Sequence, residues 1–183
     1  MLASNRPPRH DPNMDLASYL RDVPDFPKPG ILFKDISPML ASAKAMHAAT
    51  NQFAALEFGK IDKIAGIESR GFLFGVPLAM KLGIGFVPIR KPGKLPCKTN
   101  RVEYELEYGT DSVEIHQDAV QEGERVLMID DLLATGGTMN AACQLVESCG
   151  GIIAGCGFVI ELQFLNGREN LAKHRCEALI KVS

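Results

Sequence analysis

Two adjacent carboxylates followed by a loop of small residues are the feature of this sequence best suited to chemistry. Asp130 and Asp131 follow the apolar run 126–129, and the loop 134–138 after them holds two threonines and two adjacent glycines. The main-chain N–H groups of such a loop, together with the amino end of a helix predicted at 138–149, can hold an anion such as phosphate. The two carboxylates can accept hydrogen bonds from neighbouring hydroxyl groups. A phosphate beside a diol describes a ribose 5-phosphate.

The pattern is neither a Walker A loop nor a Gly-x-Gly-x-x-Gly turn, because no Gly-Lys-Ser/Thr follows and the glycines are adjacent. An ordinary strand-to-helix turn with an acidic rim is the alternative interpretation of an isolated Asp-Asp pair. The whole run 126–138, however, closely resembles the phosphoribosyl pyrophosphate-binding motif of the type I phosphoribosyltransferases, in the form found in adenine phosphoribosyltransferases. The resemblance implies that the ribose 5-phosphate of this donor is bound by Asp130, Asp131, Ala134, Thr135, Gly136, Gly137 and Thr138.

The elements that must position these residues alternate between strands and helices. Short apolar runs predict buried strands at 63–67, 85–89, 126–129, 152–162 and 177–182. Helical spacing predicts helices at 15–21, 44–58, 72–82, 138–149 and 167–173. This order indicates an α/β, doubly wound domain with a mainly parallel central sheet, which is also the fold that the family resemblance implies. We expect the 183 residues to form one domain with a flexible tail at 1–13.

The turn after the strand 63–67 repeats the order of strand, polar residues and helix. In α/β sheets such turns line the ligand crevice. Arg70, taken alone, could equally be a surface charge. The run 68–75, Glu-Ser-Arg-Gly-Phe-Leu-Phe-Gly, is similar to the family turn that takes pyrophosphate, which implies that role for Glu68, Ser69 and Arg70. The resemblance also raises the question of a cis peptide bond between Glu68 and Ser69, which would be costly without proline.

Three cations follow the strand 85–89 within five residues, in a chain whose net charge is −2. They are more than a solvated strand end requires. The loop resembles the pyrophosphate-facing loop of the family, which implies that Arg90, Lys91 and Lys94 bind pyrophosphate. Lys98 and Arg101 are further candidates without a counterpart in the family pattern.

A stiff loop is predicted at 24–30, which contains three prolines and a glycine. Phe33 beyond it, taken alone, is best read as a core side chain. The run 29–38, however, resembles the base-holding segment of adenine phosphoribosyltransferases, in which an aromatic ring stacks on adenine and the main chain reads its edge. The resemblance implies that 24–38 binds the base, with Phe33 stacking and the main chain of Leu32 and Lys34 reading. Lys34 stands where the family often has arginine, so a guanidinium fork is not expected.

Residues 98–117 are predicted to form a β-hairpin, because apolar residues alternate with three glutamates and a Gly109-Thr110-Asp111 turn follows. Such a hairpin could close over the crevice as a lid. A row of glutamates is ordinarily a solvated face. The run 106–109, Leu-Glu-Tyr-Gly, is nevertheless similar to the family's lid motif, which implies a catalytic, proton-transfer role for Glu107 and a capping role for Tyr108. Glu103 and Glu105 are interpreted as structural.

Composition excludes several other classes of function. The nearly neutral charge gives no general attraction to nucleic acid or to a membrane. We find no apolar run long enough for a membrane span and no signal peptide, so a cytoplasmic location is expected. The sequence has five cysteines, and no two of them form a Cys-x-x-Cys pair. This pattern predicts buried reduced thiols rather than disulfides or a zinc site.

The family resemblance covers roughly residues 24–182 and implies a reaction. Adenine and phosphoribosyl pyrophosphate would give AMP and pyrophosphate, a step of purine salvage. It also implies a homodimer, and a magnesium ion held mainly through the donor and water rather than by direct protein ligands. Two alternatives stay open, namely transfer to another purine base and a non-catalytic module that senses a phosphoribosyl ligand.

Overall fold

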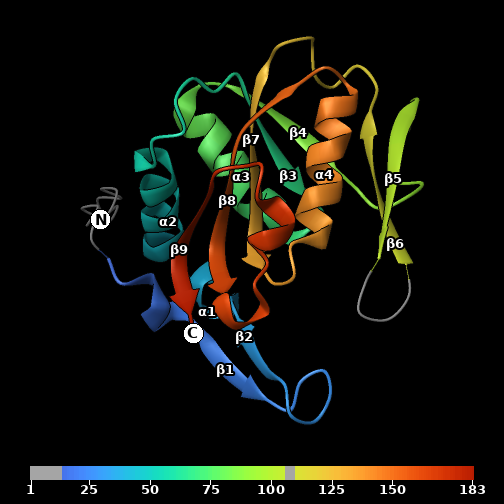
Figure 1. Cartoon of the computed structure of the whole chain (residues 1–183). Helices are drawn as coiled ribbons and strands as arrows, with labels where there is room; N and C mark the ends of the chain where they lie inside the picture. The colour runs from blue at the N-terminus through green and yellow to red at the C-terminus, as the bar shows by residue number, and fades with distance from the viewer. Residues whose placement is uncertain (1–13, 106–109) are drawn as a thin grey trace, which may run out of the picture. The chain divides into compact units, whose positions relative to one another are not determined.

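The computed structural model describes residues 14–105 and 110–183, and the chain divides into two compact units, Met1–Gln52 and Phe53–Ser183. The first unit contains the antiparallel strands β1 (Arg21–Pro24) and β2 (Leu32–Asp35), the short helix α1 (Ser37–Leu40) and most of α2 (Ala43–Ala55) (Figure 1). The helix predicted at 15–21 is only a four-residue 3-10 turn, Leu16–Tyr19, because the chain becomes extended at Arg21 to pair with Asp35.

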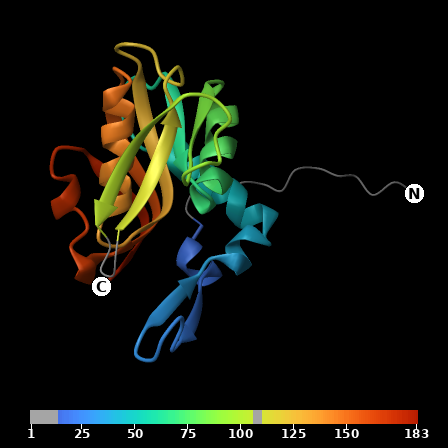
Figure 2. The same ribbon diagram turned by 90° about the vertical axis from the view of Figure 1, so that its right-hand side faces the viewer.

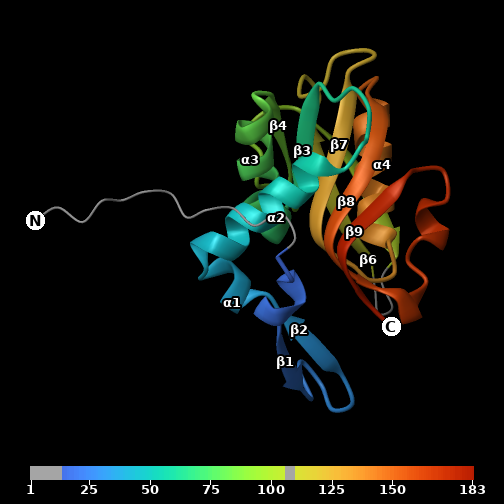
Figure 3. The ribbon, with the colours of Figure 1, turned by 90° about the vertical axis from the view of Figure 1, so that its left-hand side faces the viewer.

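The second unit is built on a five-stranded parallel sheet in the order β4-β3-β7-β8-β9. Its strands are β3 (Lys63–Ile67), β4 (Gly85–Ile89), β7 (Arg125–Leu133), β8 (Ile152–Leu162) and β9 (Cys176–Val182). Figures 2 and 3 show the helices α3 (Arg70–Leu82) and α4 (Gly137–Ser148) on opposite faces of this sheet. The doubly wound α/β fold with a parallel sheet is confirmed.

Apolar side chains account for the central strands. Ile64, Leu127 and Ile129 are at most 1% exposed, as expected for parallel strands covered on both faces. Helix α3 lies close to the sheet because it carries glycine where it meets Phe86. A Cβ at Gly75 would come within 2.7 Å of that ring. Because Phe86 belongs to β4, a larger residue at position 75 would push the helix away from the sheet at this strand.

Two predictions were wrong beyond the apolar parts of strands, one about where a strand ends and one about a helix. Strand β7 was predicted to end at Ile129, but it continues to Leu133 and so contains both aspartates. The continuation follows from β8, which pairs Ile160 with Leu132 and Glu161 with Leu133. The helix predicted at 167–173 is only a 3-10 turn, Glu169–Leu171, after a similar turn at Gln163–Leu165.

The predicted hairpin is present as β5 (Thr99–Glu105) and β6 (Thr110–His116), which pack beside α4. The expected alternation of a buried and a solvated face was wrong for β6, where Ser112 is 5% exposed and Glu114 is 9% exposed. The reason is a second contact with the loop after β4: the main chain of Arg90 pairs with that of Glu114, and the main-chain N–H of Gly93 donates to the Glu114 carboxylate at 3.2 Å. The base of the hairpin is therefore anchored on both sides.

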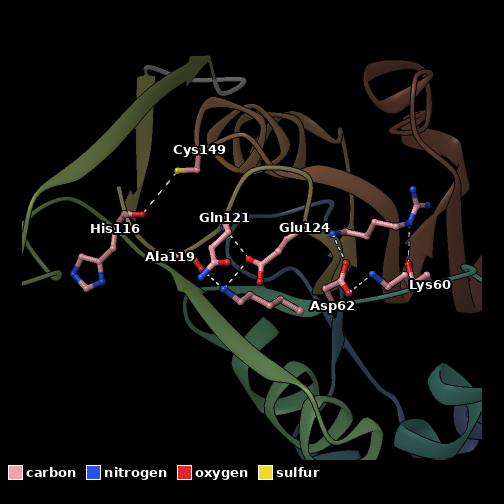
Figure 4. Close-up of polar contacts among 9 residues, drawn as sticks. Lys60, Asp62, His116, Ala119, Gln121, Glu124 and Cys149 are labelled. Atoms are coloured by element: carbon pink, nitrogen blue, oxygen red, sulfur yellow. Dashed lines mark hydrogen bonds and ion pairs between the residues drawn. The ribbon is translucent and has the colours of Figure 1, made fainter.

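An ion-pair network fastens the amino ends of β3 and β7 (Figure 4). Lys63 Nζ lies 2.8 Å from a Glu124 carboxylate oxygen. Asp62 pairs with Lys60 at 2.8 Å and accepts the main-chain N–H of Arg125 at 2.9 Å. These contacts lie at the amino ends of the strands, opposite to the carboxyl ends from which Glu68 and Arg90 follow.

All five cysteines are free thiols. Burial was correctly predicted for Cys143, Cys156 and Cys176, but Cys97 is exposed and Cys149 is only half-buried. Cys97 belongs to the loop between β4 and β5 rather than to a strand or helix. None of the helices in residues 14–105 and 110–183 is long and apolar enough to cross a membrane.

Candidate active site

Strand register brings the polar turns of the second unit to one edge of the sheet. Gly66 lies beside Ile129, and Ile67 lies beside Ile89. The residues that come next, Glu68, Asp130 and Arg90, therefore lie at the same end of three adjacent parallel strands, although β7 itself continues to Leu133. Ligands of open α/β sheets bind at this end.

A cavity of about 200 Å³ lies where β7 passes into α4. Gly136 caps the helix with a φ of 83°, a left-handed conformation that favours glycine. A glycine cap brings no side-chain acceptor of its own, so the first N–H groups of the helix are suited to an anion. The cavity is lined by all seven residues predicted to hold the ribose 5-phosphate: Asp130, Asp131, Ala134, Thr135, Gly136, Gly137 and Thr138. Its other lining residues are Arg70, Leu132, Leu133 and Met139.

The two aspartates share a strongly perturbed environment. The Asp131 side chain is 7% exposed and lies 2.9 Å from Arg70 Nε. Burial raises the pKa of Asp131, although the Arg70 guanidinium opposes that effect. Burial, and then the charge of Asp131, raise the pKa of Asp130 well above its ordinary value. Clusters with perturbed pKa values of this kind are typical of functional sites.

Gly71 lets the turn after β3 approach β7. A Cβ there would lie 2.7 Å from the carbonyl oxygen of Ile129 and 3.0 Å from Asp130 Oδ1. This close approach places Arg70 beside Asp131, so Arg70 lines the cavity at the end of β7 as well as belonging to the turn predicted for pyrophosphate. The peptide bond between Glu68 and Ser69 is cis, as the resemblance suggested. Sequence reasoning did not assign Gly71, although a glycine directly after Arg70 pointed to a close backbone contact.

The Glu68 carboxylate binds residues 90–94, which we call the basic loop. Arg90 donates to Glu68 Oε1 at 2.7 Å, and the main-chain N–H of Lys91 donates to Oε2 at 3.0 Å. The hydrogen bond from Arg90 is the largest cause that lowers the pKa of Glu68. One guanidinium donor, Arg90 Nε, is buried and has no acceptor among the described residues.

Lys91 is tied to the hairpin. Its ammonium group donates to Asp111 and, at 3.1 Å, to the Tyr104 hydroxyl. Burial acts to lower the pKa of Lys91, but these two hydrogen bonds outweigh it and raise the pKa. Asp111 was not identified from the sequence as a site residue, because its partner is twenty residues away in the chain. Lys94, by contrast, is exposed and forms no ion pair within the described part of the chain.

The predicted base-holding residues lie in the first unit. Leu32 is exposed, and the Phe33 ring meets Phe26 edge-on, with centroids 5.1 Å apart and an interplanar angle of 78°. Lys34 Nζ is 2.7 Å from Asp22, which leaves the main chain of residue 34 as its means of reading a base. Phe26 was not assigned from the sequence. The only signal for it was that it is the one aromatic residue in the proline-rich loop 24–30.

The remaining predicted residues are separate from the cavity or lie outside the described residues. Glu107 and Tyr108 belong to the latter group. Lys98 lines another cavity with Cys97, Gln117 and Asp118. Arg101 pairs with Glu103 at 3.0 Å, on the exposed side of β5.

Across residues 14–105 and 110–183, no group of three His, Cys, Asp or Glu side chains could hold a metal ion. Asp130 and Asp131 do supply hard oxygen atoms, the ligand type that magnesium prefers. These two carboxylates could therefore contact a magnesium ion that reaches the site with the donor and water.

Comparison with known proteins agrees with this geometry. The model of the phosphoribosyl transferase domain matches residues 35–175. A curated adenine phosphoribosyltransferase of Thermoanaerobacter pseudethanolicus is 58% identical over 168 residues, which is 91% of this chain and 97% of the relative. The crystal structure of that species' enzyme matches with a TM-score of 0.88 at 56% identity, covering 91% of this chain and 98% of the other.

The Saccharomyces cerevisiae adenine phosphoribosyltransferase, solved with adenine and an imino-altritol bisphosphate, matches with a TM-score of 0.86 at 43% identity. That match covers 90% of this chain and 96% of the other. The chain belongs to the phosphoribosyl transferase family and, within it, to the adenine phosphoribosyltransferases.

Proposed function

We propose that the cavity at the end of β7 binds the ribose 5-phosphate of phosphoribosyl pyrophosphate, and that the chain transfers this group to adenine, giving AMP and pyrophosphate in purine salvage. The observation that carries the proposal is the union, in one cavity, of two buried carboxylates and a glycine-capped helix start. Asp130 and Asp131 accept hydrogen bonds from the ribose hydroxyls. The N–H groups and hydroxyls of residues 134–138 hold the 5-phosphate.

The pyrophosphate is held by the turn at 68–70 and by the cations of the basic loop. Arg70, Arg90 and Lys91 already stand at the carboxyl ends of the strands, and Lys94 adds an exposed charge. Arg90 Nε, which has no acceptor among the described residues, supports the proposal, because a buried donor without an acceptor is costly and a phosphate oxygen would satisfy it. Ser69 contributes through its main chain, at the start of α3.

Adenine is read by the first unit. Strand β2 pairs only with β1 among the described strands, so its other edge offers main-chain donors and acceptors at Leu32 and Lys34. The ring of Phe33 stacks on the base. Main-chain reading suits the exocyclic amine of adenine, because a carbonyl that accepts from this amine would face an oxygen atom in a 6-oxopurine.

The reaction breaks the bond between the anomeric carbon and pyrophosphate, and it forms a bond to a ring nitrogen of adenine. The aspartates hold the ribose as it gains positive charge, and the cations hold the leaving pyrophosphate as it gains negative charge. Glu107 takes the proton that adenine loses, and Tyr108 caps the closed site. Asp130 and Asp131 are the residues that would hold a magnesium ion arriving with the donor, and the ion would supply positive charge to the leaving pyrophosphate.

The exposed face of α3 is our candidate for a homodimer contact. Leu73, Val76 and Met80 recur at helical spacing and are 43%, 38% and 78% exposed. Met80→Lys should then shift the protein from dimer to monomer in sedimentation, and a wild-type monomer would contradict the assembly.

The five free thiols support a cytoplasmic location, where cysteines stay reduced.

The function is tested by incubating the protein with magnesium, phosphoribosyl pyrophosphate and one purine at a time. AMP should form with adenine, and hypoxanthine and guanine should give little product. Turnover of hypoxanthine or guanine instead would favour a different base. Binding of the donor with no product from any purine would favour a non-catalytic sensing module.

A further inference from the structure

We call the loop 134–138 the phosphate loop; it contacts a segment that the proposed function does not use. We call residues 166–171 the bracing segment; it connects β8 to β9 and contacts α4 (Figure 1). Asn170 Nδ2 donates to the carbonyl oxygen of Thr135 at 2.7 Å. A Cβ on Gly136 would lie 2.3 Å from the carbonyl oxygen of Gly167, and one on Gly167 would lie 2.2 Å from that of Ala134. The two main chains are thus in direct contact, and glycine is needed on both sides.

Gly167 needs to be glycine for this contact alone. Its φ is outside the left-handed region, so its backbone conformation is open to other residues. The residue is buried, and the Leu133 side chain lies as close as 2.9 Å to a Cβ placed there. Any side chain at 167 would therefore push against the end of β7 and the first residue of the phosphate loop.

The bracing segment is itself fastened to the sheet. Arg168 donates two hydrogen bonds to the Glu161 carboxylate, from Nε to Oε1 at 2.6 Å and from Nη2 to Oε2 at 2.7 Å. Glu161 is 4% exposed and pairs in β8 with Leu133 of β7. Leu171, at the other end of the segment, is buried in the core with Met139 of α4. The segment is held at the level where β7 ends, so it can act as a fixed support.

We infer that Gly167 and Asn170 are positioning residues for the 5-phosphate of the donor, which they affect by orienting the peptide between Thr135 and Gly136. In a planar trans peptide the C=O and N–H groups point in opposite directions. Because Asn170 holds the carbonyl of Thr135, the N–H of Gly136 points away from Asn170. Gly136 lines the cavity and Asn170 does not, so the fixed peptide can present its N–H to a phosphate there.

This inference rests on the proposed function, and the experiment separates the two. Ribose 5-phosphate and pyrophosphate are titrated separately into the parental protein and into Asn170→Ala, Asn170→Gln and Gly167→Ala, with thermal unfolding measured for each. Asn170 is exposed, so Asn170→Ala is expected to fold. Gln163→Ala is the matched control, since it removes an exposed amide from the neighbouring 3-10 turn.

Asn170→Ala should weaken ribose 5-phosphate binding about threefold to tenfold, the loss expected for one hydrogen bond. Asn170→Gln keeps the amide donor and should recover most of this loss. Gly167→Ala should weaken it by about tenfold or more, since the loop must move away from an added methyl group. Pyrophosphate binding should be unchanged in all variants, and Gln163→Ala should match the parental protein for both ligands.

Unchanged ribose 5-phosphate affinity in Asn170→Ala would overturn the inference. An equal loss for both ligands would also overturn it, because the effect would then be general rather than local to the phosphate loop. If the parental protein bound neither ligand and made no AMP, the proposed function itself would fail, whatever the variants did.

Discussion

Replacing Asp131 with asparagine should separate donor binding from folding. The carboxylate is 7% exposed and pairs with an Arg70 side chain that is 44% exposed. The substitution removes this ion pair, but it also removes a charge that burial disfavours and that repels Asp130. Arg70 can turn to water, so no buried charge is left alone. We expect the free energy of unfolding to change by only about 1 kcal/mol in either direction.

Donor binding should change more. A hydrogen bond from a sugar hydroxyl to a carboxylate contributes roughly 1.5–3 kcal/mol, which corresponds to a factor of about 10 to 150 in Kd. The amide oxygen of asparagine still accepts one hydrogen bond but carries no charge. We therefore expect a loss of about tenfold to a hundredfold in the affinity for phosphoribosyl pyrophosphate.

Calorimetric titration of phosphoribosyl pyrophosphate with magnesium, and urea unfolding, measure the two effects. Asp62→Asn is the matched control, because Asp62 is an ion-paired carboxylate at the opposite edge of the same sheet. The hydrogen bond from Lys60 is the main cause that lowers the pKa of Asp62, so its charge favours folding. The control should lower stability and leave donor Kd unchanged. Unchanged Kd in Asp131→Asn, or an equal loss in both variants, would refute the reasoning.

Three further outcomes are expected. Glu107→Gln should lower kcat with adenine by about 10² to 10⁴-fold while donor Kd stays the same, and Glu103→Gln should do little; near-parental kcat in both would remove Glu107 from the chemistry. Hypoxanthine should be used far less than adenine, by about 10⁴-fold if main-chain groups around Phe33 go unpaired, and comparable turnover would contradict base reading there. Because the pKa of Asp130 is raised in the folded protein, lowering the pH should protonate this carboxylate at pH values above the ordinary carboxylate range, which should reduce donor affinity and increase the free energy of unfolding. Asp130→Asn should flatten both pH profiles. Profiles identical to those of the parental protein would show that Asp130 does not titrate there.

The sequence predicted the strands well where both faces are covered by helices, because such strands are continuous apolar runs of distinctive length. β3 and β4 have the predicted bounds. The run before Asp130 gave the start of β7 to within one residue but not its end, because strand pairing with β8 continues through two acids. Polar residues inside a strand cannot be told from a polar turn without knowing what the neighbouring strand does.

The site was predictable to the extent that its residues are local in sequence. The loop 134–138 forms one cavity because its residues are adjacent in the chain. Asp111 and Asn170 were not found, because each acts on a residue twenty or more positions away. Gly71 and Gly167 are needed for close backbone contacts, and a glycine in the sequence does not reveal which main chain it meets.

The cations proposed for pyrophosphate are paired with carboxylates of their own chain, and this pairing bears on how the leaving group could be held. A pyrophosphate can approach Arg90 at its Nε, but it competes with Glu68 for Arg90 Nη2 and with Asp111 for Lys91. The carboxylates would not be stranded by that exchange. Glu68 Oε2 still accepts the main-chain N–H of Lys91 at 3.0 Å, and Asp111 Oδ1 still accepts that of Ser112 at 2.7 Å.

Each cation can therefore turn from its own carboxylate to a phosphate oxygen without leaving a buried charge unsatisfied, which keeps the cost of the exchange low. Before the donor arrives, the same carboxylates neutralise a basic loop that would otherwise repel itself. After transfer they compete again for the cations, so they should favour release of pyrophosphate. If they do, Asp111→Asn should tighten pyrophosphate binding, since Lys91 loses the rival of the phosphate.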